Sequence, residues 1–209
     1  MRSISTSIAI ALLCACARPL PAPPAPQMGP AGPPAAVTGA EVEVETQRGD
    51  SLVVRSPSRT TPLGAGDECP SFSALTHEGR RVEVAAGTQP RALVVYFYPR
   101  DETPGCTREA CSLRDAFHDI TAAGADVIGV STDTLAAHRA FAEHHRLPFG
   151  LISDPDGRLA AAFGLRVTDG VAPRITFLVG RSGHVGRVFP DVRVDLHGAD
   201  VIEALATLH

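Results

Sequence analysis

The chain has 209 residues, with 19 Lys and Arg against 23 Asp and Glu, so its formal net charge is −4. This modest balance, without a basic block or interleaved aromatic residues, argues against a nucleic-acid partner. Aromatic residues make up 5% of the chain, so a core must rest mainly on aliphatic side chains and Phe. The first fifty or so residues differ in composition from the rest, which leaves about 150 for one globular α/β domain.

Residues 1–17 are typical of an export signal. Arg2 precedes an apolar run over 8–17, which is too short to span roughly 30 Å of hydrocarbon. The run ends in LCAC, which resembles a bacterial lipoprotein box with Cys16 as the lipidated residue; placing the lipid on Cys14 fits less well, because Leu at −1 is bulky. We therefore expect a signal peptide over 1–16, export to the periplasm or cell envelope, and a membrane anchor on Cys16. The alternative is a cytoplasmic enzyme whose true start lies downstream.

A tether is expected between this signal and the domain. Residues 18–36 are dense in Pro and Ala, a composition that forms an extended, semi-rigid linker without a core. Residues 41–55 contain two alternating runs around a polar Gly-Asp turn, and they fit either a short hairpin or a disordered segment. We therefore divide the chain into the signal over 1–16, a tether and uncertain segment over 17–60, and a domain over 61–209.

The rest of the chain alternates between strand and helix patterns, as in successive βα units. Apolar or alternating runs predict strands, segments without Gly or Pro predict helices, and polar turns containing Gly predict two hairpins. The expected elements are a hairpin over 72–84, a strand over 92–98, a helix over 106–120, a strand over 126–131, a helix over 135–145, a strand over 150–153, a helix over 156–163, a hairpin of strands 175–179 and 185–189, and a helix over 199–208.

Cys106 lies where the strand over 92–98 passes through a Pro-bounded turn into the helix over 106–120. The unpaired N–H groups and the positive end of the dipole at a helix start favour a thiolate, which is the reactive form of cysteine. The alternative is a small buried hydrophobe, the usual role of a free cysteine. Because a turn rich in Pro and Gly is a poor place to bury a side chain, we expect Cys106 to be a nucleophile.

A second thiol, Cys111, follows five residues later on the same helix. The α-carbons of residues i and i+5 of an ideal helix lie roughly 8–9 Å apart, whereas a disulfide requires about 4.4–6.8 Å. A bond between Cys106 and Cys111 therefore requires the first turn or two of the helix to unwind. The alternative for Cys111 is a packed helix residue.

The string PRDETPGCTREACSLRD, residues 99–115, resembles the active-site segment of peroxiredoxins of the bacterioferritin-comigratory-protein type. The signature P-x-x-x-T-x-x-C of that family is matched by Pro99, Thr103 and Cys106, and the similarity runs from about Leu63 to the C-terminus. The resemblance implies an α/β, thioredoxin-like fold in which helices flank a central β-sheet and a β-hairpin is added at the N-terminal end.

The resemblance also implies the roles of five residues. Cys106 is the peroxidatic thiol and Cys111 the resolving thiol, and Arg174, at the start of the last hairpin, faces Cys106 and stabilises its thiolate. Thr103 is expected to cap the helix and to hold the thiolate through its hydroxyl, and Pro99 is expected to end the strand and shape the pocket. The alternative for Arg174 is a surface charge.

A thioredoxin-dependent peroxidase is therefore expected. It would reduce hydrogen peroxide and organic hydroperoxides through a sulfenic acid and an intramolecular disulfide, and thioredoxin or a thioredoxin-like donor would recycle it. No metal, haem or other cofactor is required, and proteins of this subfamily are often monomers. The alternatives are an envelope thiol–disulfide oxidoreductase, disfavoured because the domain has no C-x-x-C pair, and a non-catalytic peroxide sensor.

Three further residues have weaker signals. Cys69 lies in DECPSF, where the family offers no role to transfer, so it is either a packed, inert thiol or a second resolving candidate. His144 and His145 are adjacent on one predicted helix, so we expect them to be solvated rather than to face a common ligand. No further Cys or His near the C-x4-C pair has the spacing of a zinc or iron–sulfur site.

Overall fold

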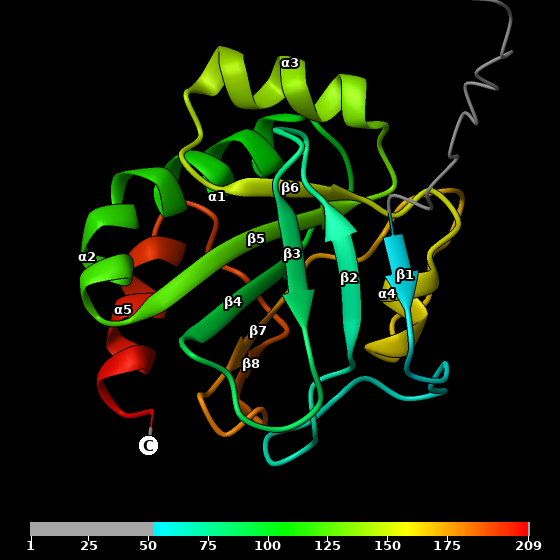
Figure 1. The fold of residues 1–209 in the computed structure, drawn as a ribbon. Coiled ribbons are helices and arrows are strands. Elements are labelled where there is room, and N and C mark those ends of the chain that lie inside the picture. Colours follow the sequence, from blue (N-terminus) through cyan, green and yellow to red (C-terminus); the bar gives the residue numbers. More distant parts are fainter. Residues whose placement is uncertain (1–51, 209) are drawn as a thin grey trace, which may run out of the picture. The chain divides into compact units, whose positions relative to one another are not determined.

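The computed structural model describes residues 52–208, which form two β-sheets and five helices (Figure 1). The expected signal, the lipidation site Cys16 and most of the expected tether lie outside the described residues. Of the helices within 52–208, none has both the length and the apolar character needed to cross a bilayer. The elements are β1 (Leu52–Val54), β2 (Phe72–Leu75), β3 (Arg81–Val84), β4 (Ala92–Phe97), α1 (Pro104–Asp115), α2 (Phe117–Ala122), β5 (Ala125–Ser131), α3 (Leu135–His145), β6 (Gly150–Ser153), α4 (Arg158–Ala162), β7 (Ile175–Val179), β8 (Val185–Phe189) and α5 (His197–Ala206).

The larger sheet has the strand order β6-β5-β4-β7-β8. β4 pairs parallel with β5, and β5 pairs parallel with β6, whereas β7 pairs antiparallel with both β4 and β8. Every residue of the central strand β4 is buried, as expected for an apolar strand that is covered on both faces. The predicted α/β fold with a central sheet flanked by helices is confirmed.

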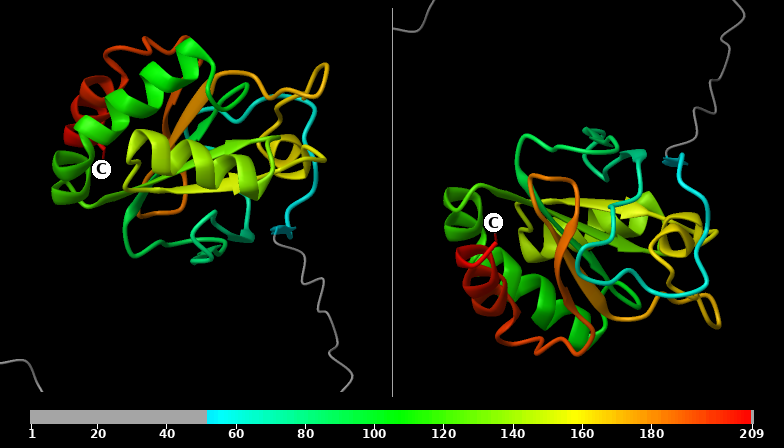
Figure 2. Two further views of the ribbon diagram at one scale, coloured as in Figure 1. Left: turned by 90° about the horizontal axis from the view of Figure 1, so that it is seen from above. Right: turned by 90° about the horizontal axis from the view of Figure 1, so that it is seen from below.

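Different elements cover the two faces of this sheet. Successive side chains of a strand point to opposite faces. On one face Val94 and Tyr96 of β4 join a cluster with residues of α1, α2, α3 and α5. On the other face Val95 and Phe97 join a cluster with residues of α4 and of the smaller sheet. Figure 2 shows α1 and α5 on one side of the large sheet and the β2–β3 hairpin on the other.

The smaller sheet consists of the predicted hairpin β2–β3 and the additional strand β1, in the antiparallel order β1-β2-β3. Leu52 of β1 lies opposite Ala74 and is buried. The second alternating run of the uncertain segment 41–55 is therefore a strand, whereas its first run lies outside the described residues. The folded part of the chain includes this strand, which precedes residue 61, where we expected the domain to begin.

The bounds of α3, β6, β7 and β8 are those predicted from the sequence, but the predicted helix over 106–120 is wrong in two respects. Its true start is Pro104, since a proline fits the first helical position, where no N–H partner is needed. The helix also divides into α1 and α2 at Ala116, whose φ is −89° and ψ is −4°. At that point α5 comes very close: a Cβ added to Gly198 would lie 2.4 Å from the carbonyl oxygen of Ser112. The predicted helix therefore divides where α5 packs against it, and the local sequence does not reveal this tertiary contact.

Candidate active site

The turn between β4 and α1 places Cys106 in the first turn of α1. The expectation that this turn would not bury the side chain is wrong, because Cys106 packs into the cluster beneath α1 and is buried. Pro99 lies half-buried just beyond the end of β4, as its predicted role as a strand terminator requires. Thr103 occupies the N-cap position with an extended backbone, and its carbonyl oxygen accepts a hydrogen bond from the N–H of Thr107 at 2.9 Å. The first N–H groups of a helix have no partner within the helix, so this position offers hydrogen-bond donors to a negatively charged group.

The hydroxyl of Thr103 neither caps α1 nor contacts the sulfur of Cys106, the two roles expected of it. It donates a hydrogen bond to the carbonyl oxygen of Arg100 at 3.0 Å, and it makes no side-chain cap bond to α1. The predicted side-chain cap is therefore wrong, because the cap is formed by the backbone. Since the hydroxyl proton is directed to Arg100, it is not directed to the sulfur of Cys106 in this conformation.

Arg174 directly precedes β7 and reaches the sulfur of Cys106. Its Nη2 lies 3.2 Å from Sγ, and its Nη1 forms an ion pair with the carboxylate of Glu109. Gly105 lies beside the guanidinium: a Cβ added there would be 3.2 Å from Nη2, so a larger residue would crowd this contact. The structure thus brings Arg174 and Cys106 together across 68 residues of sequence, as the resemblance implied.

Glu109 is a site residue that the sequence analysis missed. It lies three residues after Cys106, on the same face of α1, and its side chain is completely buried. Burial raises the pKa of this carboxyl from 4.5 to about 7, and the charge of Arg174 offsets part of that rise. Oε1 has no hydrogen-bond partner among the described residues. The available signal was the i, i+3 spacing from the nucleophile, but a Glu on a helix ordinarily indicates a solvated face.

A buried polar network holds the turn that precedes α1. The hydroxyl of Tyr98 donates to Oδ1 of Asp101 at 2.8 Å, and Oδ2 of the same carboxylate lies 2.9 Å from Nδ1 of His138 on α3. The backbone N–H of Asp101 donates to the carboxylate of Asp133 at 2.9 Å, and Nε2 of His138 lies 3.2 Å from the carbonyl oxygen of Ile152. These contacts attach the turn to α3 and β6. The sequence did not show them, because the partners are distant along the chain.

Cys111 lies half-buried on α1, and the helix is continuous from Pro104 to Asp115. In this helical geometry the α-carbons of Cys106 and Cys111 are too far apart for a disulfide, and both thiols are free. The guanidinium of Arg114 lies beside the sulfur of Cys111. The structure therefore shows a reduced conformation in which the two thiols are separated.

Cys69 lies on the opposite face of the large sheet from Cys106. Its side chain belongs to the cluster with α4 and the smaller sheet, whereas Cys106 belongs to the cluster with α1 and α5. Burial, with a smaller contribution from the charge of Glu68, raises the pKa of the Cys69 thiol to about 12. A Cys69–Cys106 bond would require a sulfur to cross the sheet, so the structure favours the packed, inert alternative for Cys69.

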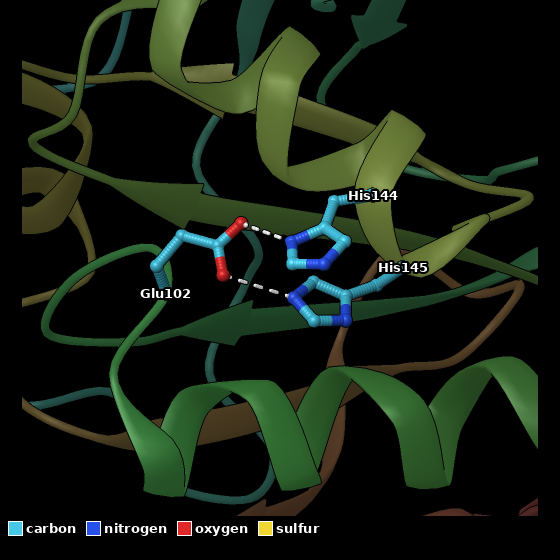
Figure 3. A group of neighbouring side chains, drawn as sticks. All are labelled: Glu102, His144 and His145. Atoms are coloured by element: carbon cyan, nitrogen blue, oxygen red, sulfur yellow. Dashed lines mark hydrogen bonds and ion pairs between the residues drawn. The ribbon is translucent and has the colours of Figure 1, made fainter.

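The expectation that His144 and His145 do not face a common ligand is wrong. Both rings face the carboxylate of Glu102, which lies in the turn ahead of α1 (Figure 3). His144 is exposed and His145 is largely covered. Both residues are helical, as the last two of α3, so the orientation of their side chains rather than the helix spacing brings the rings to one carboxylate.

Comparison with known proteins gives the family. Residues 65–188 match the family model described as the AhpC/TSA family. The chain is similar to Peroxiredoxin Bcp of Escherichia coli K12, at 39% identity over 144 residues that cover 65% of this chain and 91% of that protein. It is also similar to the chloroplastic Peroxiredoxin Q of Oryza sativa subsp. japonica, at 34% identity over 149 residues that cover 70% and 68% of the two chains.

The solved structures agree with the sequence relatives. Peroxidoxin BcpB from Mycobacterium tuberculosis is similar with a TM-score of 0.64 and 30% identity, over 70% of this chain and 99% of that one. A cysteine-to-serine mutant of Xylella fastidiosa PrxQ is similar with a TM-score of 0.64 and 26% identity, over 70% and 98%. The predicted resemblance and thioredoxin-like fold are confirmed. The chain belongs to the AhpC/TSA family and, within it, to the Bcp/PrxQ peroxiredoxins, which are thiol peroxidases.

Proposed function

We propose that the peroxidase cycle of this chain begins at the sulfur of Cys106. The observation that carries the proposal is the contact of 3.2 Å between Nη2 of Arg174 and Sγ of Cys106 at the start of α1. The thiolate attacks one peroxide oxygen, the O–O bond breaks, and the leaving oxygen takes up a proton to become water or an alcohol. Cys106 is left as a sulfenic acid.

Arg174 assists this step through its charge. A guanidinium beside the sulfur stabilises the thiolate, and it also stabilises the negative charge that develops on the leaving oxygen as the O–O bond breaks. The hydrogen bond from Nη1 to Oε2 of Glu109 fixes the orientation of the guanidinium from the buried side. The site thus presents the nucleophile and a fixed positive charge on the same side of the incoming peroxide.

The second step requires α1 to open. We propose that Cys111 attacks the sulfenic sulfur, which forms the Cys106–Cys111 disulfide and releases the hydroxyl group as water. The sulfur of Cys106 is buried, and the intact helix separates the two α-carbons, so the first turns of α1 must unwind before the bond can form. An external dithiol, thioredoxin or a thioredoxin-like donor, then supplies the two electrons that restore both thiols.

Steady-state turnover tests this proposal. The reduced protein, supplied with thioredoxin and its reductase, should consume hydrogen peroxide and an organic hydroperoxide continuously, and Cys106→Ser should abolish the consumption. Cys69→Ala is the matched control, since this thiol lies on the other face of the sheet, and it should keep most of the activity. Full activity of Cys106→Ser would overturn the proposal. Consumption of a single equivalent of peroxide without turnover would favour a sensor.

Export and lipid anchoring are a separate proposal, which the sequence of residues 1–17 alone supports. We propose that the protein acts as a monomer in the cell envelope, with Cys16 as its lipidated mature N-terminus. Intact-mass analysis of the natively expressed protein should show the loss of the residues ahead of Cys16 and an added diacylglycerol and acyl mass. A mass that retains Met1 would contradict the proposal.

A further inference from the structure

Three metal-ligating side chains from two elements converge beside the active-site turn. Glu102 lies in the turn ahead of α1, and His144 and His145 end α3 (Figure 3). Nδ1 of His144 lies 3.1 Å from Oε1 of Glu102, and Nε2 of His145 lies 3.1 Å from Oε2. One ligand atom from each residue can be chosen so that all three lie within 4.8 Å of one another. The spacing is close to that of ligands around one small ion, which binds at roughly 2.0–2.2 Å from each.

This convergence is unusual for neighbouring residues of a helix. Successive helix positions are rotated by about 100°, yet the two imidazole rings lie side by side, with centroids 4.3 Å apart and planes tilted by 32°. A hydrogen bond from each ring to a different oxygen of Glu102 holds both rings toward the same point. A single cation between the rings and the carboxylate would satisfy all three groups at once.

The backbone holds these ligands in place before any ion binds. Glu102 has a φ of 58°, a left-handed conformation that residues other than glycine seldom adopt. Arg146, which follows the two histidines, is also left-handed and ends α3. The His145 ring makes an edge contact with the buried Phe141 at a centroid distance of 4.9 Å, and only 16% of its side chain is exposed. The site therefore combines a fixed ligand, His145, with the more accessible His144.

We propose that Glu102, His144 and His145 bind a divalent transition-metal ion of the zinc class. Two imidazole nitrogens with one carboxylate suit Zn²⁺, whereas Mg²⁺ and Ca²⁺ prefer ligand sets made only of oxygen. The two oxygens of Glu102 face one ring nitrogen each, so the carboxyl group is placed to act as the third ligand. Each ring binds as a neutral imidazole, with its proton on the nitrogen that faces away from the ion.

The ion would fasten the turn ahead of α1 to the end of α3. The same end of α3 is already attached to α1, because Nη1 of Arg114 donates to the carbonyl oxygen of His145 at 2.9 Å. Glu102 lies two residues before the first residue of α1. The site is thus a structural one at the border of the active-site turn, distinct from the thiols, and its existence does not depend on the proposed catalytic cycle.

Imidazole resonances test the proposal directly. Long-range ¹H–¹⁵N correlation spectra of the full-length reduced chain, titrated with Zn²⁺, should show shifts of the ligating nitrogens, Nδ1 of His144 and Nε2 of His145, that are complete at one equivalent of bound ion. His118 and His184 are exposed elsewhere and serve as internal controls whose resonances should not move. Because the readout is specific for histidine, zinc held by thiolates does not imitate it. Unchanged resonances of His144 and His145 at saturation would overturn the proposal.

Affinity differences supply the second test. His144 is 70% exposed, so His144→Gln should leave the packing of α3 intact while it removes a ligand. This variant and Glu102→Gln should each weaken Zn²⁺ binding at least about tenfold, measured by competition with a chromophoric chelator. His118→Ala is the matched control and should bind as the wild type does. Equal affinity of the wild type and His144→Gln would contradict the site even if zinc binds elsewhere.

Discussion

The buried carboxyl of Glu109 should cause the stability of this protein to fall between pH 5 and pH 7.5. The side chain is completely buried, its Oε2 accepts a hydrogen bond from Arg174, and Oε1 has no partner among residues 52–208. Burial raises its pKa from 4.5 to about 7. In this window the folded chain keeps a proton on Glu109 that the unfolded chain has released, so raising the pH favours unfolding.

The size of the effect follows from the two pKa values. With a carboxyl pKa of about 7 in the folded chain and 4.5 in the unfolded chain, linkage gives a loss of about 2 kcal/mol between pH 5 and pH 7.5. Glu109→Gln keeps the shape of the side chain and removes its titration. The free energy of unfolding of the wild type, minus that of Glu109→Gln, should therefore fall by this amount across the range, because the other titrating groups are common to both proteins.

Urea unfolding at a series of pH values, followed by far-UV circular dichroism, measures this difference. Both proteins should be reduced, so that no disulfide forms during the experiment. The slope of free energy against urea concentration should be the same for both, which confirms that the substitution has not altered the unfolded state. Parallel pH profiles would refute the reasoning, since they would mean that Glu109 is ionised in the folded protein throughout the range.

Three further predictions concern the turn and the helix. Arg174→Ala should slow the reaction of Cys106 with peroxide by on the order of 100-fold, because the positive charge facing the sulfur is lost; an unchanged rate constant in competition kinetics at neutral pH would remove Arg174 from the site. Tyr98→Phe should lower the free energy of unfolding by about 1–2 kcal/mol, because the buried Oδ1 of Asp101 loses the hydroxyl that donates a hydrogen bond to it. Equal urea midpoints and slopes would show that this hydrogen bond contributes nothing. Amides of residues 107–113 should exchange faster in the oxidised protein than in the reduced one; equal protection, with the disulfide mapped, would exclude unwinding of α1.

The sequence predicted the elements whose signals are local. β7 and β8 are short apolar or alternating runs around a turn that contains Gly, and α3 is preceded by Thr134, whose hydroxyl accepts a bond from the N–H of Ala137. Such patterns depend on neighbouring residues only. The division at Ala116 was not predictable in this way, because it coincides with the close approach of Gly198 from α5.

The residues of the candidate site also differ in whether a local sequence signal reveals them. Cys106 and Cys111 were found from their position at a strand-to-helix turn, and Arg174 was found only through the resemblance, because nothing local distinguishes it from a surface charge. Glu109 was missed because its burial depends on how α1 packs on the sheet. The convergence of Glu102 with the end of α3 was missed because the partners are 42 and 43 positions apart in the sequence, which a local pattern does not show.

The central claim is that Cys106 is the thiol that reacts with peroxide, and trapping the first oxidation product tests it most directly. In Cys111→Ser the sulfenic acid has no resolving partner, so one equivalent of peroxide followed by dimedone should label the protein once. Peptide mapping by mass spectrometry should place the label on Cys106. A label on Cys69, or an unlabelled protein that has nevertheless consumed the peroxide, would contradict the account.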